Sequence, residues 1–237
     1  METTSFHHRV LRQDVGLGVV VVHGVTIGAA PAVLADELSR WIERRKAPLD
    51  PGDEAMRQAC RDLLRHGTYK PTGRGKPASE YLLRAALDSS FPRVNGPVDA
   101  NNLVSLAHLV PVSVWDLDLA GTQGFEFRHG AAGESYVFNA AGQALELTDL
   151  LCGCGLLADG RSCPMVTAVK DSLATKLRED TRRVAGCVYF PLTTDSGGAD
   201  RLHAVTLELE RWLRLCCSEP RSAVGVCLPG ETLTLEV

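Results

Sequence analysis

The chain has 237 residues, a formal net charge of −4 and 45% hydrophobic residues. That length suits one large domain, and the composition is unlike that of a disordered chain. A net acidic charge argues against a protein that coats nucleic acid non-specifically, because neutralising phosphates needs an excess of Lys and Arg. A basic face on one side of the molecule remains compatible with this charge.

The segment 15–35 contains no Asp, Glu, Lys or Arg, so a membrane span has to be considered first. Four glycines, His23 and Pro31 interrupt the segment, which is unfavourable for a spanning helix. Its β-branched part, 17–22, predicts a buried strand, followed by a turn and a helix that begins near Pro31. Without a convincing export signal, we expect a cytoplasmic protein with no membrane partner, whose eight cysteines are free thiols.

The remaining periodicities predict an α+β fold of layered mixed and antiparallel sheets with flanking helices. Helices are expected over 31–45, 53–66, 78–87 and from Asp99 or Asn101 to about Leu109. Strands are expected over 112–114, 125–128, 135–138, 144–147, 184–192, 223–227 and 232–237, with an amphipathic helix after the loop 195–200. No linker or internal repeat divides the sequence, so we expect a single domain over residues 1–237.

The loop 67–77 is rich in Gly and Pro and presents the cations Lys70, Arg74 and Lys76. Prolines restrict the backbone of such a loop and hold its cations in place. This arrangement favours contact with nucleic-acid phosphates, and an ordinary exposed loop is the alternative.

The run 92–118 contains a Pro/Asn/Gly turn, an apolar segment expected to be helical and, at its end, the sequence Trp-Asp-Leu-Asp. Polar residues at the ends of rigid elements are what a binding cleft requires. Asn101, Asn102, Ser113, Asp116 and Asp118 are therefore candidate site residues. Simpler roles are available for some of them: Asp99 and Asn101 are suited to capping the helix, and Asp118 to a solvated strand end.

Two parts of this run carry a resemblance to a known family. Residues 98–104 (Val-Asp-Ala-Asn-Asn-Leu-Val) are similar to the pattern Val-Val-Asp-x-Thr-Asn-Tyr-Val, with Asp99 and Asn102 retained. Residues 109–116 (Leu-Val-Pro-Val-Ser-Val-Trp-Asp) are similar to Gly-Gln-Pro-Met-His-Ala-Phe-Asp, with Pro111 and Asp116 retained. Both patterns belong to the B3/B4 editing domain of the phenylalanyl-tRNA synthetase β subunit. The chain resembles still more the stand-alone proteins made of that domain alone, most strongly over residues 67–191.

Some positions depart from the family pattern. The pocket His of the synthetase falls on Ser113, and its pocket Glu falls near Cys187. Stand-alone members have an Arg-Asp pair where this chain has Lys170-Asp171. Asp171 is also suited to capping a short helix, so a helix cap and a pocket residue are equally possible roles for it.

The resemblance implies a hydrolase that deacylates a mischarged aminoacyl-tRNA in trans, without metal or other cofactor and without an obligate protein partner. An activated ester needs a positioned water and a stabilised oxyanion, and no Ser-His-Asp motif occurs in the sequence. We expect the catalytic residues to be Asn102, Asp116 and Asp171. Substrate binding is expected from Asn101, Ser113, Asp118 and Lys170, and tRNA binding from Lys70, Arg74 and Lys76.

The carboxylates Asp116, Asp118 and Asp171 suggest a cationic amino acid, such as the arginine analogue canavanine. One alternative function is a non-catalytic module of the same fold that binds tRNA or another RNA. A weaker alternative is an enzyme that acts on a small amino-acid derivative.

Three cysteines, Cys152, Cys154 and Cys163, could supply thiolates to zinc. A structural zinc site takes a fourth ligand, and paired zinc-binding cysteines are usually separated by two residues rather than one. We therefore predict no metal site.

Overall fold

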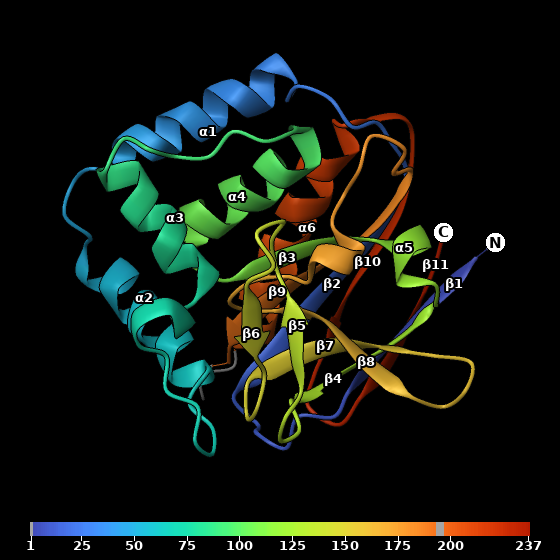
Figure 1. Cartoon of the computed structure of the whole chain (residues 1–237). Helices are drawn as coiled ribbons and strands as arrows, with labels where there is room; N and C mark the ends of the chain where they lie inside the picture. The colour runs from blue at the N-terminus through green and yellow to red at the C-terminus, as the bar shows by residue number, and fades with distance from the viewer. Residues whose placement is uncertain (1, 193–196) are drawn as a thin grey trace.

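The computed structural model describes residues 2–192 and 197–237 and has an α+β architecture in layers (Figure 1). One five-stranded sheet has the order β11–β1–β4–β7–β8. Its strands are β1 (Thr3–His8), β4 (Gly124–His129), β7 (Leu151–Leu156), β8 (Ser162–Thr167) and β11 (Thr232–Glu236). Its pairs are antiparallel except that of β1 with β4, which is parallel. The pairing of β1 with β11 brings the two ends of the chain together, as Figure 1 shows.

A second, antiparallel sheet has the order β10–β2–β9–β3. Its strands are β10 (Cys217–Cys227), β2 (Val15–Val25), β9 (Arg183–Pro191) and β3 (Val112–Asp116). This sheet is the middle layer, because alternate side chains of β2 enter two different cores. Val19 and Val21 pack toward the first sheet, whereas Val20 and Val22 pack toward helices. Burial on both faces explains why the sequence of β2 is a continuous apolar run rather than an alternating one.

Helices form the third layer. They are α1 (Ala32–Arg44), α2 (Pro51–Leu63), α3 (Ala78–Leu87), α4 (Gly96–His108) and α6 (Gly198–Arg214), and a short helix α5 (Leu117–Ala120) follows β3. Helix α4 is buried around most of its circumference, between α1, α3, α6 and β3. A short hairpin of β5 (Ser135–Val137) and β6 (Ala144–Glu146) pairs with neither large sheet and contacts the end of β8.

The expectation of an α+β fold with layered mixed and antiparallel sheets is confirmed. The segment 15–35 forms β2, a turn and the start of α1, and no helix among the described residues has the length and apolar character to cross a membrane. All eight cysteines are free.

Several expected boundaries are wrong. Helix α4 begins at Gly96 and not near Asp99 or Asn101, because the Oδ1 atom of Asn95 accepts a hydrogen bond from the Val98 N–H at 3.0 Å and caps the helix. Helix α2 begins at Pro51, after the N-cap Asp50, and ends before His66. Strands β1, β7 and β8 are not among the expected elements. The expected loop 195–200 lies partly outside the described residues.

Candidate active site

A cavity of about 520 Å³ opens where α4 passes the outer edge of the middle sheet. One wall consists of α4 side chains, including Asn101 and Asn102, and another consists of Val112 and Val114 on the edge strand β3. The segment after β8 and the end of the β5–β6 hairpin complete the cavity, whose remaining lining residues are Ala78, Val94, Asn95, Val98, Phe138, Asn139, Lys170, Asp171, Lys176 and Leu177. The cavity therefore brings together four of the predicted site residues: Asn101, Asn102, Lys170 and Asp171.

The two asparagines are oriented by the start of α4. The cap at Asn95 and a hydrogen bond from the Val94 N–H to Asp99 Oδ1 (3.0 Å) fix the first turn of the helix. Asn101 Nδ2 then donates to Asn102 Oδ1 at 3.2 Å. The Nδ2 group of Asn102 donates to no acceptor among the described residues. The buried Oδ1 atom of Asn101 likewise has no donor among them. Both are positions where a ligand can complete a hydrogen bond.

A tight turn at the end of β8 places Asp171. The hydroxyl of Thr167 accepts from the Lys170 N–H at 3.1 Å, and the Thr167 N–H donates to Asp171 Oδ1 at the same distance. Tyr136 holds the turn from the hairpin side, since its hydroxyl donates to the Lys170 carbonyl oxygen at 2.5 Å. The following short helix, Leu173–Thr175, is capped by Ser172, so Asp171 is not the cap and its side chain lies at the cavity.

The carboxyl of Asp171 is held on one side only. Ser113 Oγ donates to its Oδ1 atom at 2.7 Å, alongside the Thr167 N–H, whereas Oδ2 accepts from no described residue. Burial raises the pKa of Asp171 to about 7, against the smaller lowering effects of these two hydrogen bonds and of Lys176. A carboxyl with this pKa exchanges its proton near neutral pH, which is the requirement for a general acid or base.

Two lysines and an aromatic ring also line the cavity. Lys170 Nζ lies 4.2 Å from the centroid of the Phe138 ring and 5.6 Å from that of Tyr81. Burial lowers the pKa of Lys170, and neighbouring Arg74 adds to this effect. Lys176 donates from Nζ to the Phe138 carbonyl oxygen at 2.6 Å. The site thus contains one carboxyl and two ammonium groups.

Three of the predicted site residues do not line the cavity. Ser113, expected to bind substrate, is 1% exposed and lies behind Asp171, whose carboxyl it holds. Asp116, expected to be catalytic, is 2% exposed: Oδ1 accepts from the N–H groups of residues 118 and 119 at the start of α5, and Oδ2 accepts from Thr181. Trp115 beside it points between the two sheets, against Phe125. Asp118, expected to bind substrate, is paired with Arg183 on the surface.

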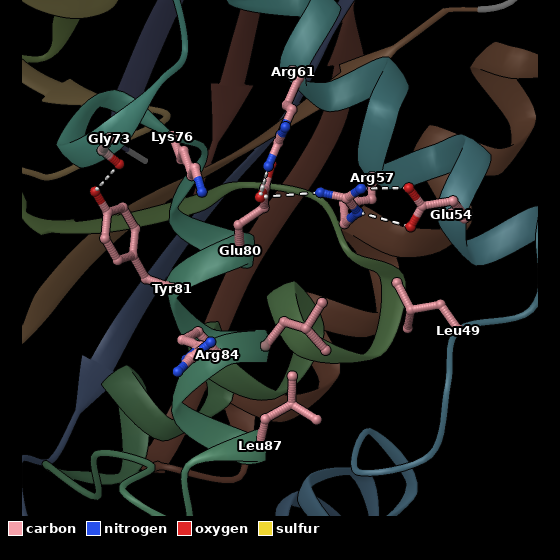
Figure 2. A pocket seen from close by; sticks show the side chains of 11 residues that line it. Leu49, Glu54, Arg57, Arg61, Gly73, Lys76, Glu80, Tyr81, Arg84 and Leu87 are labelled. Carbon is pink, nitrogen blue, oxygen red and sulfur yellow. Dashed lines mark hydrogen bonds and ion pairs between the residues drawn. The ribbon is translucent and has the colours of Figure 1, made fainter.

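The predicted tRNA-binding cations lie on the loop between α2 and α3, and none of them lines the cavity. None of Lys70, Arg74 and Lys76 forms a salt bridge with a described residue. The arginines of the neighbouring helices differ, because Arg57 and Arg61 of α2 both bind Glu80 of α3 across a groove of about 430 Å³. Figure 2 shows these ion pairs, with Lys76 on the same groove and no dashed contact to it.

The three cysteines considered as zinc ligands differ in their burial. Cys152 and Cys154 are buried in the core between the sheets, whereas Cys163 is exposed on β8. Burial raises the pKa of the Cys154 thiol to about 12, which keeps it protonated. Over residues 2–192 and 197–237, no group of three or more His, Cys, Asp or Glu side chains is placed to hold a metal ion.

Sequence reasoning missed Phe138, Asn139 and Lys176 as cavity residues. Asn139 follows a hairpin strand and Lys176 follows a short 3₁₀ turn, and no local pattern links either to α4. Only the nearness of Lys176 to the Lys170-Asp171 pair in sequence pointed to this region.

No protein-family model matches the chain, and no curated protein matches it in sequence.

Proposed function

We propose that the chain hydrolyses the aminoacyl ester of a mischarged tRNA in the cavity lined by Asp171, with a fold of the B3/B4 editing type. The observation that carries this proposal is the state of Asp171. Its pKa is raised to about 7, one oxygen is held by Ser113 and Thr167, and the other has no partner among the described residues. A carboxyl arranged in this way is suited to proton transfer, and a purely RNA-binding module has no need of it.

The reaction needs few groups. The ionised carboxyl of Asp171 takes a proton from a water molecule as the water oxygen attacks the ester carbonyl carbon. The N–H donor of Asn102 and the ammonium of Lys170 stabilise the developing oxyanion. The bond between the carbonyl carbon and the ribose oxygen then breaks, and the ribose oxygen takes up the proton from Asp171. The products are the amino acid and uncharged tRNA.

The cavity also bears on which amino acid is accepted. Of the three carboxylates that suggested a cationic side chain, only Asp171 lines the cavity, and two lysines lie there with it. The walls beside Asp171 are apolar: Val94, Val98, Val112, Val114 and Leu177. The two ammonium groups repel a cationic substrate side chain, so this composition favours an uncharged, mainly apolar side chain over an arginine analogue.

A deacylation panel tests the proposed function. The full chain is mixed with individually mischarged tRNAs that carry apolar, polar and cationic amino acids, canavanine included, and loss of the ester is followed over time. We expect selective hydrolysis of an uncharged aminoacyl ester, abolished by Asp171→Asn. A panel with no hydrolysis would overturn the proposal, and tRNA binding in the same samples would then favour the non-catalytic module.

The three loop cations, which form no salt bridge with a described residue, provide a second test. Replacing Lys70, Arg74 and Lys76 together by Gln is expected to weaken tRNA binding and reduce its salt dependence. A matched triple variant at Arg40, Lys46 and Arg161 changes the net charge equally at exposed positions on α1, after α1 and before β8. Equal loss in both triple variants would indicate a net-charge effect and remove the loop from the proposal.

A further inference from the structure

The turn that follows α2 is attached to the first sheet and to the segment beside it by three contacts. Arg12 Nη1 lies 2.7–3.1 Å from the carbonyl oxygens of residues 62, 63 and 65 at the end of α2. Asp149 Oδ2, just before β7, accepts from the N–H and from the hydroxyl of Thr68, each at 2.7 Å. The ring of His66 stacks on that of His129, the last residue of β4. We call these five residues the histidine junction, and none of them lines the Asp171 cavity.

The two imidazole rings of the junction form a close parallel stack. Their centroids are 3.5 Å apart and their planes differ by 8°. Burial lowers the pKa of His129 to about 4, and the charges of His66 and Arg12 add to this lowering against the opposing effect of Asp149. Neutral rings stack favourably, whereas two imidazolium ions at this separation repel each other. The stack is therefore a contact that depends on uncharged histidines.

The charged groups around the stack do not offset added protons. Asp149 is the carboxylate that faces the rings, and its pKa is held low chiefly by the two hydrogen bonds from Thr68. It therefore stays ionised when the histidines begin to gain protons. The other charged groups at the ends of these elements are paired with one another: Arg12 with Asp14, Arg65 with Asp62, and Arg128 with Glu134.

The junction holds one end of the loop 67–77. Gly67 allows the close approach, since its φ is +49° and a Cβ atom there would lie 2.3 Å from Asp149 Oδ2. The Tyr69 N–H then donates to the His66 carbonyl oxygen at 2.8 Å. The other end of the loop is attached separately, because the Ala78 N–H donates to the carbonyl oxygen of residue 168 at 2.9 Å. Loss of the ring stack can thus free the first end of the loop while the second end stays in place.

We propose that the histidine junction is an acid-sensitive latch, in which protonation of the stacked rings releases the first end of the loop 67–77 from the sheet. The inference concerns the loop and not the Asp171 cavity, so it does not depend on ester hydrolysis. Under the proposed function, the released segment carries the cations that bind tRNA, so acidification would loosen the tRNA-binding surface.

The expected size of the effect follows from the two states of His129. In the released loop its pKa returns to the ordinary value of 6.5, whereas in the closed junction it is about 4. The closed junction is therefore most stable above pH 6.5, and that stability is lost as the pH falls toward 4. Between pH 7.5 and pH 5 the equilibrium constant for opening should rise about thirtyfold.

Hydrogen exchange of individual amides in the full chain tests the latch. After correction for the intrinsic effect of pH, exchange at Thr68 and Tyr69 should be about thirtyfold faster at pH 5 than at pH 7.5, with no comparable change at Ala78. His129→Phe keeps a buried ring on His66 but carries no charge, so its exchange should change by less than about threefold. The matched control is His203→Gln, at an exposed histidine on α6, which should keep the thirtyfold change.

Three outcomes would overturn the latch. The first is exchange at Thr68 and Tyr69 that does not depend on pH in the wild type. The second is the same thirtyfold change in His129→Phe, and the third is an equal change at Ala78, which would indicate unfolding of the whole domain. An NMR titration of the wild-type histidines gives a decision without a variant. A His129 ring that titrates near pH 6.5 while the loop amides stay protected would also overturn the latch.

Discussion

Asp171 and Glu80 are carboxyls that line two different cavities, and their surroundings differ. Glu80 lies between two guanidinium groups, those of Arg57 and Arg61, and its side chain is 9% exposed (Figure 2). Asp171 is held by a hydroxyl and a backbone N–H and forms no salt bridge with a described residue. Glu80 thereby ties α2 to α3 through two ion pairs, whereas the raised pKa of Asp171 keeps a proton available near neutral pH. A buried carboxyl therefore indicates a functional group only when neither a cation nor hydrogen bonds satisfy both of its oxygens.

The largest difference between the two carboxyls is expected in the rate of ester hydrolysis. Asp171→Asn removes the proton acceptor while keeping the shape of the side chain, and the rate constant should fall about 10²–10⁴-fold. Glu80→Gln, the matched change in the other carboxyl, should leave the rate constant within about threefold. Single-turnover deacylation at pH 7.5 measures both. Equal losses in the two variants would show that Asp171 has no catalytic role that Glu80 lacks.

The two carboxyls should differ in the opposite sense in stability. Glu80→Gln leaves two partly buried guanidinium groups without their shared anion, and we expect the free energy of unfolding to fall by about 2–3 kcal/mol. Urea unfolding measures this loss. The control is Glu54→Gln, because Glu54 is an exposed partner of Arg57 and its removal should have a smaller effect. An unchanged stability in Glu80→Gln would show that this ion pair is not what joins α2 to α3.

The raised pKa of Asp171 predicts that folding stability decreases as the pH rises. In the unfolded chain the carboxyl ionises near its ordinary value of 3.8, whereas in the folded chain it does so only near 7. Ionisation therefore opposes folding: stability is lost as pH rises from about 4 to 7, and the penalty is complete above 7. Asp171→Asn should stabilise the protein by about 4 kcal/mol at pH 8, the equivalent of a pKa raised from 3.8 to about 7, and leave it unchanged near pH 4. Urea unfolding at the two pH values checks this, and a gain that does not depend on pH would refute it.

Much of the helical layer and part of strand β2 could be predicted from sequence, because their signals are local. The expected helix over 78–87 coincides with α3, and Leu17–Val22 lies inside β2. Strand β7 gave no such signal, because its Leu-Cys-Gly-Cys-Gly-Leu sequence has little β propensity. Gly153 is required there by packing, since a Cβ atom would lie 2.6 Å from Val166 Cγ2. That constraint comes from the paired strand β8, which is not visible in the sequence of β7.

The site could be predicted only in part, for the same reason. Asn102 and Asp171 were found through the family resemblance, and the structure places both at the cavity. Asp116 and Asp118 were favoured by their sequence context, but their partners, Thr181 and Arg183, lie 65 residues further along the chain. Contacts over such distances depend on how the sheet pairs, so no local pattern separates a satisfied carboxylate from an available one.

The hydrogen bond from Ser113 is expected to affect the pKa of Asp171. This bond favours the ionised carboxyl, so Ser113→Ala should raise the pKa of Asp171 further. The pH dependence of kcat/KM, which should rise through about pH 7 in the wild type, is then expected to shift upward by about one unit. A profile that falls in height without shifting would mean that Ser113 affects packing alone.

A third carboxyl, Asp116, extends the comparison, and its replacement is expected to have the smallest effect of these variants. Its two oxygens are satisfied by backbone N–H groups at the start of α5 and by the Thr181 hydroxyl, so it is neither ion-paired nor available to a ligand. Asp116→Ala should therefore act as the loss of a helix cap, lowering the free energy of unfolding by about 1 kcal/mol. The rate constant for deacylation should stay within about threefold, because Asp116 does not line the cavity. A loss of rate comparable to that of Asp171→Asn, at unchanged stability, would return Asp116 to the catalytic site and show that a fully hydrogen-bonded carboxylate can serve there.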